Sequence, residues 1–248
     1  MKALVVSGAL ASALLLAGCG GDAGAGNSGS DSATGGASGQ TAAIPAPNGG
    51  DWTTVVSATP EGGFVMGNPN APVKLVEFAS MTCPHCASFA AEGMPALRDN
   101  YIKSGRVSLE FRNFVRDPYD LTGALLSRCA GPANFFALTD RIFGTQDAWI
   151  ARVKPQVAAI GALPENQRLA RIASVSGMEA LAAKAGVPAA RAKQCLSDPK
   201  GTEKLVQMRK VAVDTYGLEG TPTFILNGKN TGVYDWAALK PLLGPPGS

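Results

Sequence analysis

The sequence predicts an α/β fold in which a helical domain is inserted between a strand–helix–strand half and a hairpin-plus-helix half. Two apolar runs, Val73–Ala79 and Val107–Phe114, flank a segment with helical periodicity and predict the parallel strand–helix–strand unit. The stretch at about residues 117–203 contains alanine-rich segments of helix length, broken by proline and glycine. Strand character returns at Thr223–Leu226, directly before the hairpin signal Asn227-Gly228.

The first residues of the chain have the features of an export signal. Lys2 precedes an apolar run, Ala3–Leu16, which suits a secretory signal peptide and is too short to span a bilayer. The run ends in Leu16-Ala17-Gly18-Cys19, which resembles the lipobox of bacterial lipoproteins, where the cysteine is acylated. We therefore expect residues 1–18 to be a lipoprotein signal peptide and Cys19 to carry the lipid. The alternative is an ordinary cleaved signal peptide.

Residues 19–50 predict a flexible tether that begins at the lipidated cysteine. This stretch is dominated by glycine, serine, alanine, asparagine and aspartate, so it cannot bury enough apolar surface to offset the entropy lost on ordering. We expect the folded domain at residues 51–248. The tether would let this domain reach partners at varying distances from a membrane.

The run Val73–Ala79 has the composition of a central strand that is covered on both faces. Glu77 interrupts it. A carboxylate in a buried strand is costly unless it has a partner or a role, so Glu77 is a candidate functional residue.

Cys83 and Cys86 stand at the start of the first predicted helix. Pro84 suits a first helical turn, and the apolar spacing from Ala90 to Tyr101 continues the helix. Two cysteines separated by two residues at a helix N-terminus predict a redox pair, because the helix stabilises the first thiolate, Cys83. His85 adds a donor or positive charge that would lower the Cys83 pKa further. The alternatives for the pair are half of a zinc site or a structural disulfide.

Cys129 and Cys195 both fall in helical segments of the insertion. In an oxidising compartment two remaining cysteines are more often paired than free, so we expect a structural disulfide between them. The alternative is two separately buried thiols, because a sequence does not establish the short Cα separation that a disulfide requires.

The C-terminal half is predicted to consist of a hairpin and a helix. Thr223–Leu226 is a short apolar run, and Asn227-Gly228 suits the positive φ angles of a two-residue hairpin turn. An amphipathic segment follows at Asp235–Leu243 and predicts a closing helix.

The composition argues against nucleic-acid binding and against a metal site. The formal charge of +3 comes from lysines and arginines that are spread along the chain, without a basic block. His85 is the single histidine, so a histidine-rich metal site cannot be assembled. We therefore expect neither a nucleic-acid partner nor a bound metal.

The segments KLVEFASMTCPHC and GTPTFILNG resemble the DsbA-like branch of the thioredoxin superfamily. The resemblance covers the chain after the tether and implies a thioredoxin fold with a helical domain between its βαβ and ββα halves. It implies a thiol:disulfide oxidoreductase that uses no cofactor beyond the redox-active Cys83–Cys86 disulfide. It further implies that Glu77 assists proton movement to and from Cys86. A structural, hydrogen-bonded glutamate is the alternative.

Thr221-Pro222 matches the cis-proline loop of the same family. The resemblance implies that this loop faces the cysteine pair and that its backbone pairs with an extended substrate strand. Pro84, Thr221 and Pro222 are therefore the expected substrate-binding residues. Thr221 departs from the valine that many DsbA oxidases carry, and threonine also occurs in isomerases, so the direction of the redox reaction is left open.

The predicted function is oxidation of cysteine pairs in exported proteins, in the periplasm or cell envelope. By resemblance, a DsbB-like membrane oxidase would reoxidise the pair, although some relatives are instead kept reduced by another thiol donor. We expect a monomer held at the membrane by its lipid anchor. The alternatives are a disulfide isomerase or reductase, and a non-catalytic surface lipoprotein that retains the fold.

Overall fold

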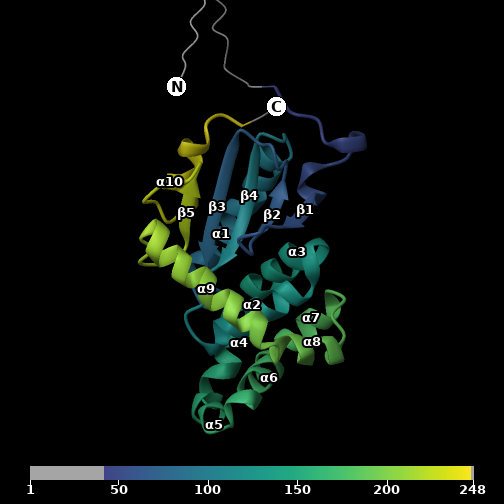
Figure 1. Ribbon diagram of the computed structural model, residues 1–248, viewed down its shortest axis with the longest axis vertical. Coiled ribbons are helices and arrows are strands. Elements are labelled where there is room, and N and C mark those ends of the chain that lie inside the picture. The colour runs from purple at the N-terminus through teal and green to yellow at the C-terminus, as the bar shows by residue number, and fades with distance from the viewer. Residues whose placement is uncertain (1–41, 247–248) are drawn as a thin grey trace, which may run out of the picture. The chain divides into compact units, whose positions relative to one another are not determined.

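The structure, a computed structural model, describes residues 42–246 (Figure 1). The predicted signal peptide, Cys19 and most of the predicted tether lie outside these residues. No helix within residues 42–246 combines the length and the apolar character that a membrane span requires.

A mixed sheet organises the described residues. Its strands are β1 Val56–Ala58, β2 Phe64–Gly67, β3 Val73–Ala79, β4 Val107–Asn113, β5 Thr223–Leu226 and β6 Lys229–Asn230. They lie side by side in the order β1-β2-β4-β3-β5-β6. β3 and β4 pair in parallel, and the other neighbouring pairs are antiparallel.

β3 is the central strand because both of its edges are paired, one with β4 and the other with β5. Its side chains are buried on both faces: Leu75 and Ala79 belong to the larger core, and Phe78 belongs to a smaller one. The apolar run read from the sequence is therefore a strand covered on both sides. The predicted α/β fold, with helices inserted between its two halves, is confirmed.

The helix α1, Pro84–Leu97, connects β3 to β4 and covers one face of the sheet. Phe89 of α1 packs against Phe224 of β5, with ring centroids 4.7 Å apart. The short helix α10, Trp236–Leu239, lies beside α1, where the Trp236 and Phe89 ring centroids are 6.3 Å apart.

The long helix α9, Pro199–Tyr216, covers the opposite face (Figure 1). Its Ala212, together with Leu218 just beyond it, packs in one cluster with Phe78 of β3 and Ile225 of β5. The two faces of β3 are thus covered by helices from different parts of the chain.

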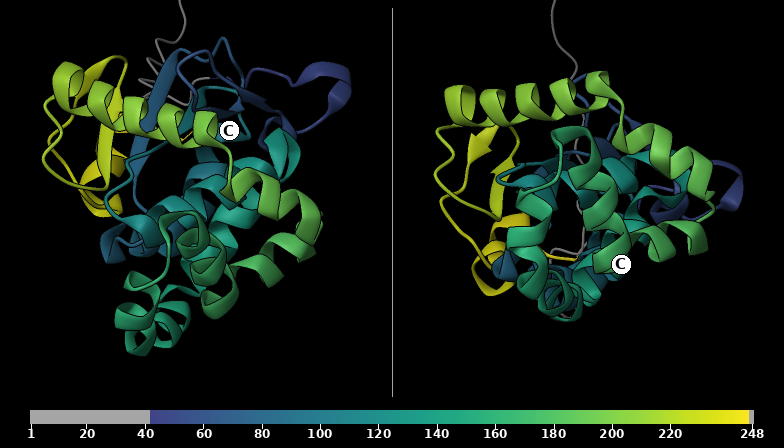
Figure 2. Two further views of the ribbon diagram at one scale, coloured as in Figure 1. Left: turned by 60° about the horizontal axis from the view of Figure 1, so that its bottom comes forward. Right: turned by 90° about the horizontal axis from the view of Figure 1, so that it is seen from below.

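The inserted helices follow β4 and end with α9 (Figures 1 and 2). Their centre is apolar, with Phe135, Leu138, Ile142 and Trp149 at most 1% exposed. Figure 1 shows most of them beyond the end of the sheet at which β3 and β4 terminate, whereas Phe135 packs against Phe111 of β4. Besides α9, these helices are α2 Pro118–Cys129, α3 Gly131–Gly144, α4 Gln146–Val153, α5 Val157–Gly161, α6 Glu165–Ser176, α7 Met178–Lys184 and α8 Ala189–Leu196.

Candidate active site

Cys83 is the residue directly before α1, and Cys86 lies in its first turn. Both side chains are thiols in this structure, and they are 3% and 0% exposed. The carbonyl of Cys83 accepts hydrogen bonds from the backbone N–H of Ala87, at 3.2 Å, and from Nε2 of Gln146, at 3.0 Å. The sulfur of Cys83 therefore sits at the positive end of a helix whose start is held by the inserted helices.

The surroundings of Cys83 lower its pKa to about 5. The largest cause is a hydrogen bond from the Cys86 thiol, and the Cys86 backbone N–H adds to it. Burial of Cys83 acts in the opposite direction. The side chain of Thr221 and the positive charge of Arg116 lower the pKa further. A thiol with a pKa near 5 is a thiolate at neutral pH, which is the reactive form.

The pKa of Cys86 is shifted in the opposite direction. Burial raises the pKa of its thiol well above the usual value, and the negative charge and hydrogen bonding at Cys83 raise it further. At neutral pH Cys86 therefore keeps its proton while Cys83 loses its own.

Thr221 meets Cys83 from the C-terminal half of the chain. The Thr221-Pro222 peptide bond is cis, and the Thr221 carbonyl accepts a hydrogen bond from Cys83 Sγ at 3.1 Å. The Thr221 hydroxyl is buried and has no hydrogen-bond partner within the described residues. A thiolate at Cys83 gives this hydroxyl an acceptor, which explains how Thr221 lowers the Cys83 pKa.

Glu77 lies on the face of β3 that α1 covers. Its neighbours across the sheet are Phe111 in β4 and Phe224 in β5, and the residue is 2% exposed. Burial raises the pKa of Glu77 to about 8, and the negative charges of Asp140 and Cys83 contribute to the rise. The carboxyl group is therefore mostly protonated at pH 7, so it can donate a proton beneath the cysteine pair.

Pro84 and His85 are exposed on the first turn of α1. The cation that lowers the Cys83 pKa is Arg116, which the sequence did not single out. A contribution from His85 stays a prediction. Gln146 was also missed, because its contact with the Cys83 loop depends on how α4 packs, and no local pattern signals that packing.

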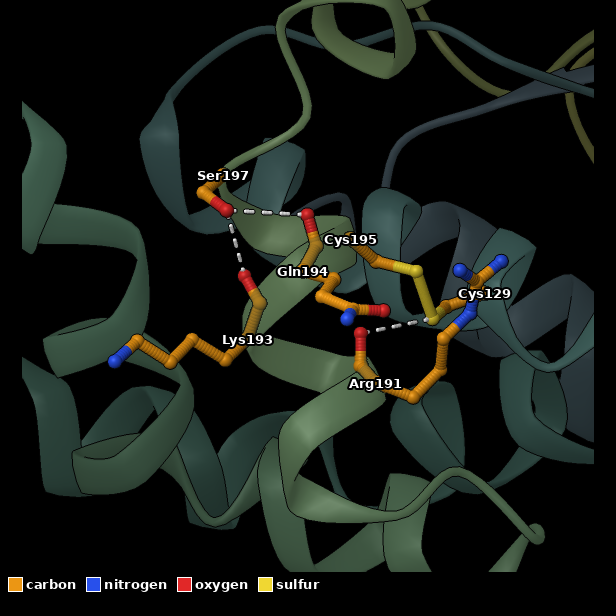
Figure 3. The surroundings of a disulfide bond; sticks show 6 residues. All are labelled: Cys129, Arg191, Lys193, Gln194, Cys195 and Ser197. Atoms are coloured by element: carbon orange, nitrogen blue, oxygen red, sulfur yellow. Dashed lines mark hydrogen bonds between the residues drawn. A yellow bond between two sulfur atoms is a disulfide. The ribbon is translucent and has the colours of Figure 1, made fainter.

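A disulfide joins Cys129 at the end of α2 to Cys195 in α8 (Figure 3). The Cα atoms are 6.0 Å apart, and the two residues are separated by 66 positions. Figure 3 shows the bridge beside the backbone of Arg191, whose carbonyl oxygen lies 3.6 Å from Cys129 Sγ. The bridge cross-links two inserted helices and leaves the Cys83–Cys86 pair free to react. Within residues 42–246, no three histidine, cysteine or acidic side chains cluster as metal ligands would.

Comparison with known proteins relates the chain to disulfide chemistry. The family described as Thioredoxin matches residues 59–243. A relative from Rickettsia felis, named as a protein-disulfide oxidoreductase, is 32% identical over 69% of this chain. That match covers 55% of the relative, so the chain spans about half the length of this curated protein.

Solved structures agree with this relation. The crystal structure of a protein-disulfide isomerase from Novosphingobium aromaticivorans is 34% identical, with a TM-score of 0.67, and the match covers 72% of this chain and 94% of that one. The α-DsbA1 structure from Wolbachia pipientis is 24% identical, with a TM-score of 0.55, over 81% of this chain and 91% of that one. At this sequence identity, the similarity to the Wolbachia pipientis structure shows a common fold alone.

Proposed function

The chain belongs to the thioredoxin family, and from this premise we propose that it is a thiol:disulfide oxidoreductase whose redox pair is Cys83 and Cys86. The observation that carries the proposal is the opposite protonation of two thiols within one helical turn, with a pKa of about 5 at Cys83 and a raised pKa at Cys86. The names of the relatives from Rickettsia felis and Novosphingobium aromaticivorans support the same chemistry.

The proposed reaction is oxidation of two client thiols by the Cys83–Cys86 disulfide. A client thiolate attacks Cys83 Sγ, forms a mixed disulfide and releases Cys86 as a thiolate. Cys86 then takes a proton from Glu77, since the high pKa of Cys86 favours its thiol form. A second client thiolate attacks the client sulfur and expels Cys83. The client loses two electrons and gains a disulfide, and the enzyme pair becomes reduced.

The low pKa of Cys83 favours this direction. A thiolate of low pKa is a good leaving group, and its stabilisation exists only in the reduced enzyme, so the disulfide accepts electrons readily. The proposed clients are exported proteins with free cysteines. The enzyme acts as a monomer, and a DsbB-like membrane oxidase re-forms its disulfide by accepting the two electrons; a thiol donor would instead keep the pair reduced, as an isomerase or reductase requires.

Mixing the oxidised enzyme with a reduced, unfolded two-cysteine peptide tests this function. The expected result is one peptide disulfide formed for each Cys83–Cys86 disulfide consumed. Cys83→Ser should abolish the reaction. Cys86→Ser, mixed instead with the disulfide form of the peptide, should accumulate a mixed disulfide at Cys83, because Cys86 is absent and cannot resolve it. The variant C129A/C195A is the matched control and should still oxidise the peptide. Absence of both peptide oxidation and disulfide reshuffling in the wild type would exclude the redox function and favour a binding protein.

Disulfide isomerisation is the second candidate. It is favoured by the name of the Novosphingobium aromaticivorans relative and by Thr221 before the cis proline. Incubation of the reduced enzyme with a protein that holds scrambled disulfides separates the two functions. Rapid recovery of the native disulfides, together with slow peptide oxidation, would establish the isomerase instead of the oxidase.

The proposed location is the cell envelope, with the domain attached through an acylated Cys19. The support is the lipobox-like tetrapeptide Leu16-Ala17-Gly18-Cys19 and the apolar run Ala3–Leu16 that leads into it. Fractionation of cells that express wild type or Cys19→Ser tests it. The wild type should sediment with membranes and the variant should not, and a wild type that stays in the soluble fraction would contradict lipidation.

A further inference from the structure

The loop that precedes Cys83 is tied to the inserted helices by a buried carboxylate. Asp120 lies in the first turn of α2 and is 0% exposed. Its oxygens accept hydrogen bonds from the Ser80 hydroxyl at 2.5 Å, the Met81 backbone N–H at 2.8 Å and the Arg116 backbone N–H at 3.0 Å. Asp120 therefore joins the Cys83 loop to the segment that leads into α2.

The side chain of Arg116 lies along the same loop. Its Nε donates to the Ser80 hydroxyl at 2.9 Å, and its terminal Nη2 donates to the Thr82 hydroxyl at 3.0 Å. The Ser80 hydroxyl in turn donates a hydrogen bond to Asp120, and the Thr82 hydroxyl donates one to Asp117 at 2.9 Å. Each hydroxyl thus accepts from the guanidinium and donates to a carboxylate, which fixes the orientation of the whole chain of hydrogen bonds.

This arrangement suits a charged group that has to stay close to a reactive sulfur. Arginine has a long side chain with considerable rotamer freedom, and an exposed arginine without partners would spread its charge over many positions. Here two donors of the guanidinium are held by residues that stand three and one positions before Cys83. The positive charge is thereby kept beside the N-terminus of α1.

We propose that Arg116 is a positioning residue for the Cys83 thiolate, and that Ser80 and Asp120 hold its guanidinium in place. The inference rests on the proposed redox function and adds a cation supplied by the segment between β4 and α2. It gives Ser80 and Thr82 a part in setting the reactivity of Cys83. Consistent with this part, Arg116 is among the groups that lower the Cys83 pKa.

Titration of the Cys83 thiolate in the reduced, full-length protein tests the proposal through the thiolate absorbance near 240 nm. Arg116→Met removes the charge and keeps the length of the side chain. We expect the pKa of Cys83 to rise by roughly 0.5 to 1, which is at or below the lower end of the range for a nearby opposite charge because Arg116 is exposed. Such a rise means a 3- to 10-fold smaller thiolate fraction below pH 5. Arg141→Met, an exposed arginine in α3, is the matched control and should leave the pKa unchanged.

Two further variants separate the charge from the hydrogen bonds. Arg116→Lys keeps the charge and should bring the pKa of Cys83 at least half way back from its value in Arg116→Met. Ser80→Ala removes the acceptor of Arg116 Nε and should raise the pKa by less than Arg116→Met. The double variant S80A/R116M should show no larger rise than R116M alone, because Ser80 acts through Arg116.

Three results would overturn the proposal: an unchanged Cys83 pKa in Arg116→Met, an equally high pKa in Arg116→Lys, or additive effects in the double variant. Circular dichroism confirms that each variant is folded before titration. The activity assays test the proposed function separately. A wild type without oxidation or reshuffling activity would contradict that function whatever the titrations show. Normal wild-type activity with no effect of Arg116→Met would remove only the positioning role.

Discussion

Cys83 and Cys86 carry the same side chain, yet their surroundings move their pKa values in opposite directions. Cys83 receives hydrogen bonds and lies near a cation, so its charged form is stabilised. Cys86 is buried and next to negative charge, so its neutral form is favoured. The difference assigns the attack to Cys83 and leaves Cys86 in need of a proton whenever the disulfide opens.

Glu77 is the residue suited to exchange that proton, and Glu77→Gln tests it. The pKa of Glu77 is raised from 4.5 to about 8 in the folded protein, so folding favours the protonated carboxyl and stability falls as pH rises from about 4.5 to 8. The glutamine variant lacks this loss. In the oxidised protein, where Cys83 carries no charge and only burial and Asp140 raise the Glu77 pKa, the variant should gain on the order of 2–3 kcal/mol over wild type between pH 5 and pH 8. Urea unfolding at the two pH values measures the gain.

The same variant should be slower as a catalyst. Loss of the proton donor for Cys86 should reduce the rate of peptide oxidation by roughly tenfold or more at pH 7, because an unprotonated Cys86 thiolate attacks Cys83 and reverses the mixed disulfide. Glu92→Gln, on the exposed side of α1, is the control and should change neither stability nor rate. A stability difference that does not vary with pH would show that Glu77 is not a buried neutral acid in the fold.

At the scale of single elements, the inserted helices depend on the bridge between α2 and α8. Replacing both cysteines, as C129A/C195A, should lower the free energy of unfolding by roughly 2–4 kcal/mol, because the unfolded chain is freed from a closed loop of 66 residues. Urea unfolding of both proteins, each with Cys83 and Cys86 oxidised, gives the difference. Equal midpoints would mean that helix packing alone holds α2 to α8.

The elements that the sequence predicted are those with a long apolar pattern or a specific turn motif. β3 follows from its apolar run, α1 from Pro84 and its apolar spacing, and the β5–β6 turn from Asn227-Gly228. β1 and β6 have three and two residues, which is too short to carry a periodic signal, and they exist because a neighbouring strand pairs with them.

The residues of the candidate site also fall into two groups, those that a local motif predicts and those that only the tertiary structure reveals. The cysteine pair, Glu77 and Thr221-Pro222 could be picked out because local motifs and a family resemblance mark them. Arg116, Asp120 and Gln146 could not, since each acts through a contact between the Cys83 loop and a segment at least 36 positions away in the sequence. Such contacts depend on tertiary packing, which single-sequence patterns do not encode.

For the whole molecule, the thiolate at Cys83 couples redox state to stability. Its pKa is about 5 in the fold against an ordinary value near 9, so the reduced protein gains stability above pH 5 and loses it as pH falls through 5. At pH 7 the gain is roughly 2–3 kcal/mol. The disulfide form has no thiolate and lacks this gain.

Thermal unfolding should therefore give a higher Tm for the reduced than for the oxidised protein at pH 7, by roughly 5–10 °C. The difference should shrink at pH 4, where Cys83 is mostly protonated even in the fold. C83S, measured with and without reductant, provides the comparison without a thiolate or a disulfide at this position. A Tm difference that is the same at both pH values would contradict the low pKa of Cys83.

The Cys129–Cys195 bridge also has a consequence for how the protein matures. Forming it takes two electrons from two thiols, which is the reaction proposed for the clients. Cys83 and Thr221 are 138 residues apart, so the reactive site is completed only after the last strands have joined the sheet. A newly made copy therefore needs an oxidant for Cys129 and Cys195 other than its own Cys83–Cys86 pair. Under the proposed function, each young copy is itself a client of the mature ones.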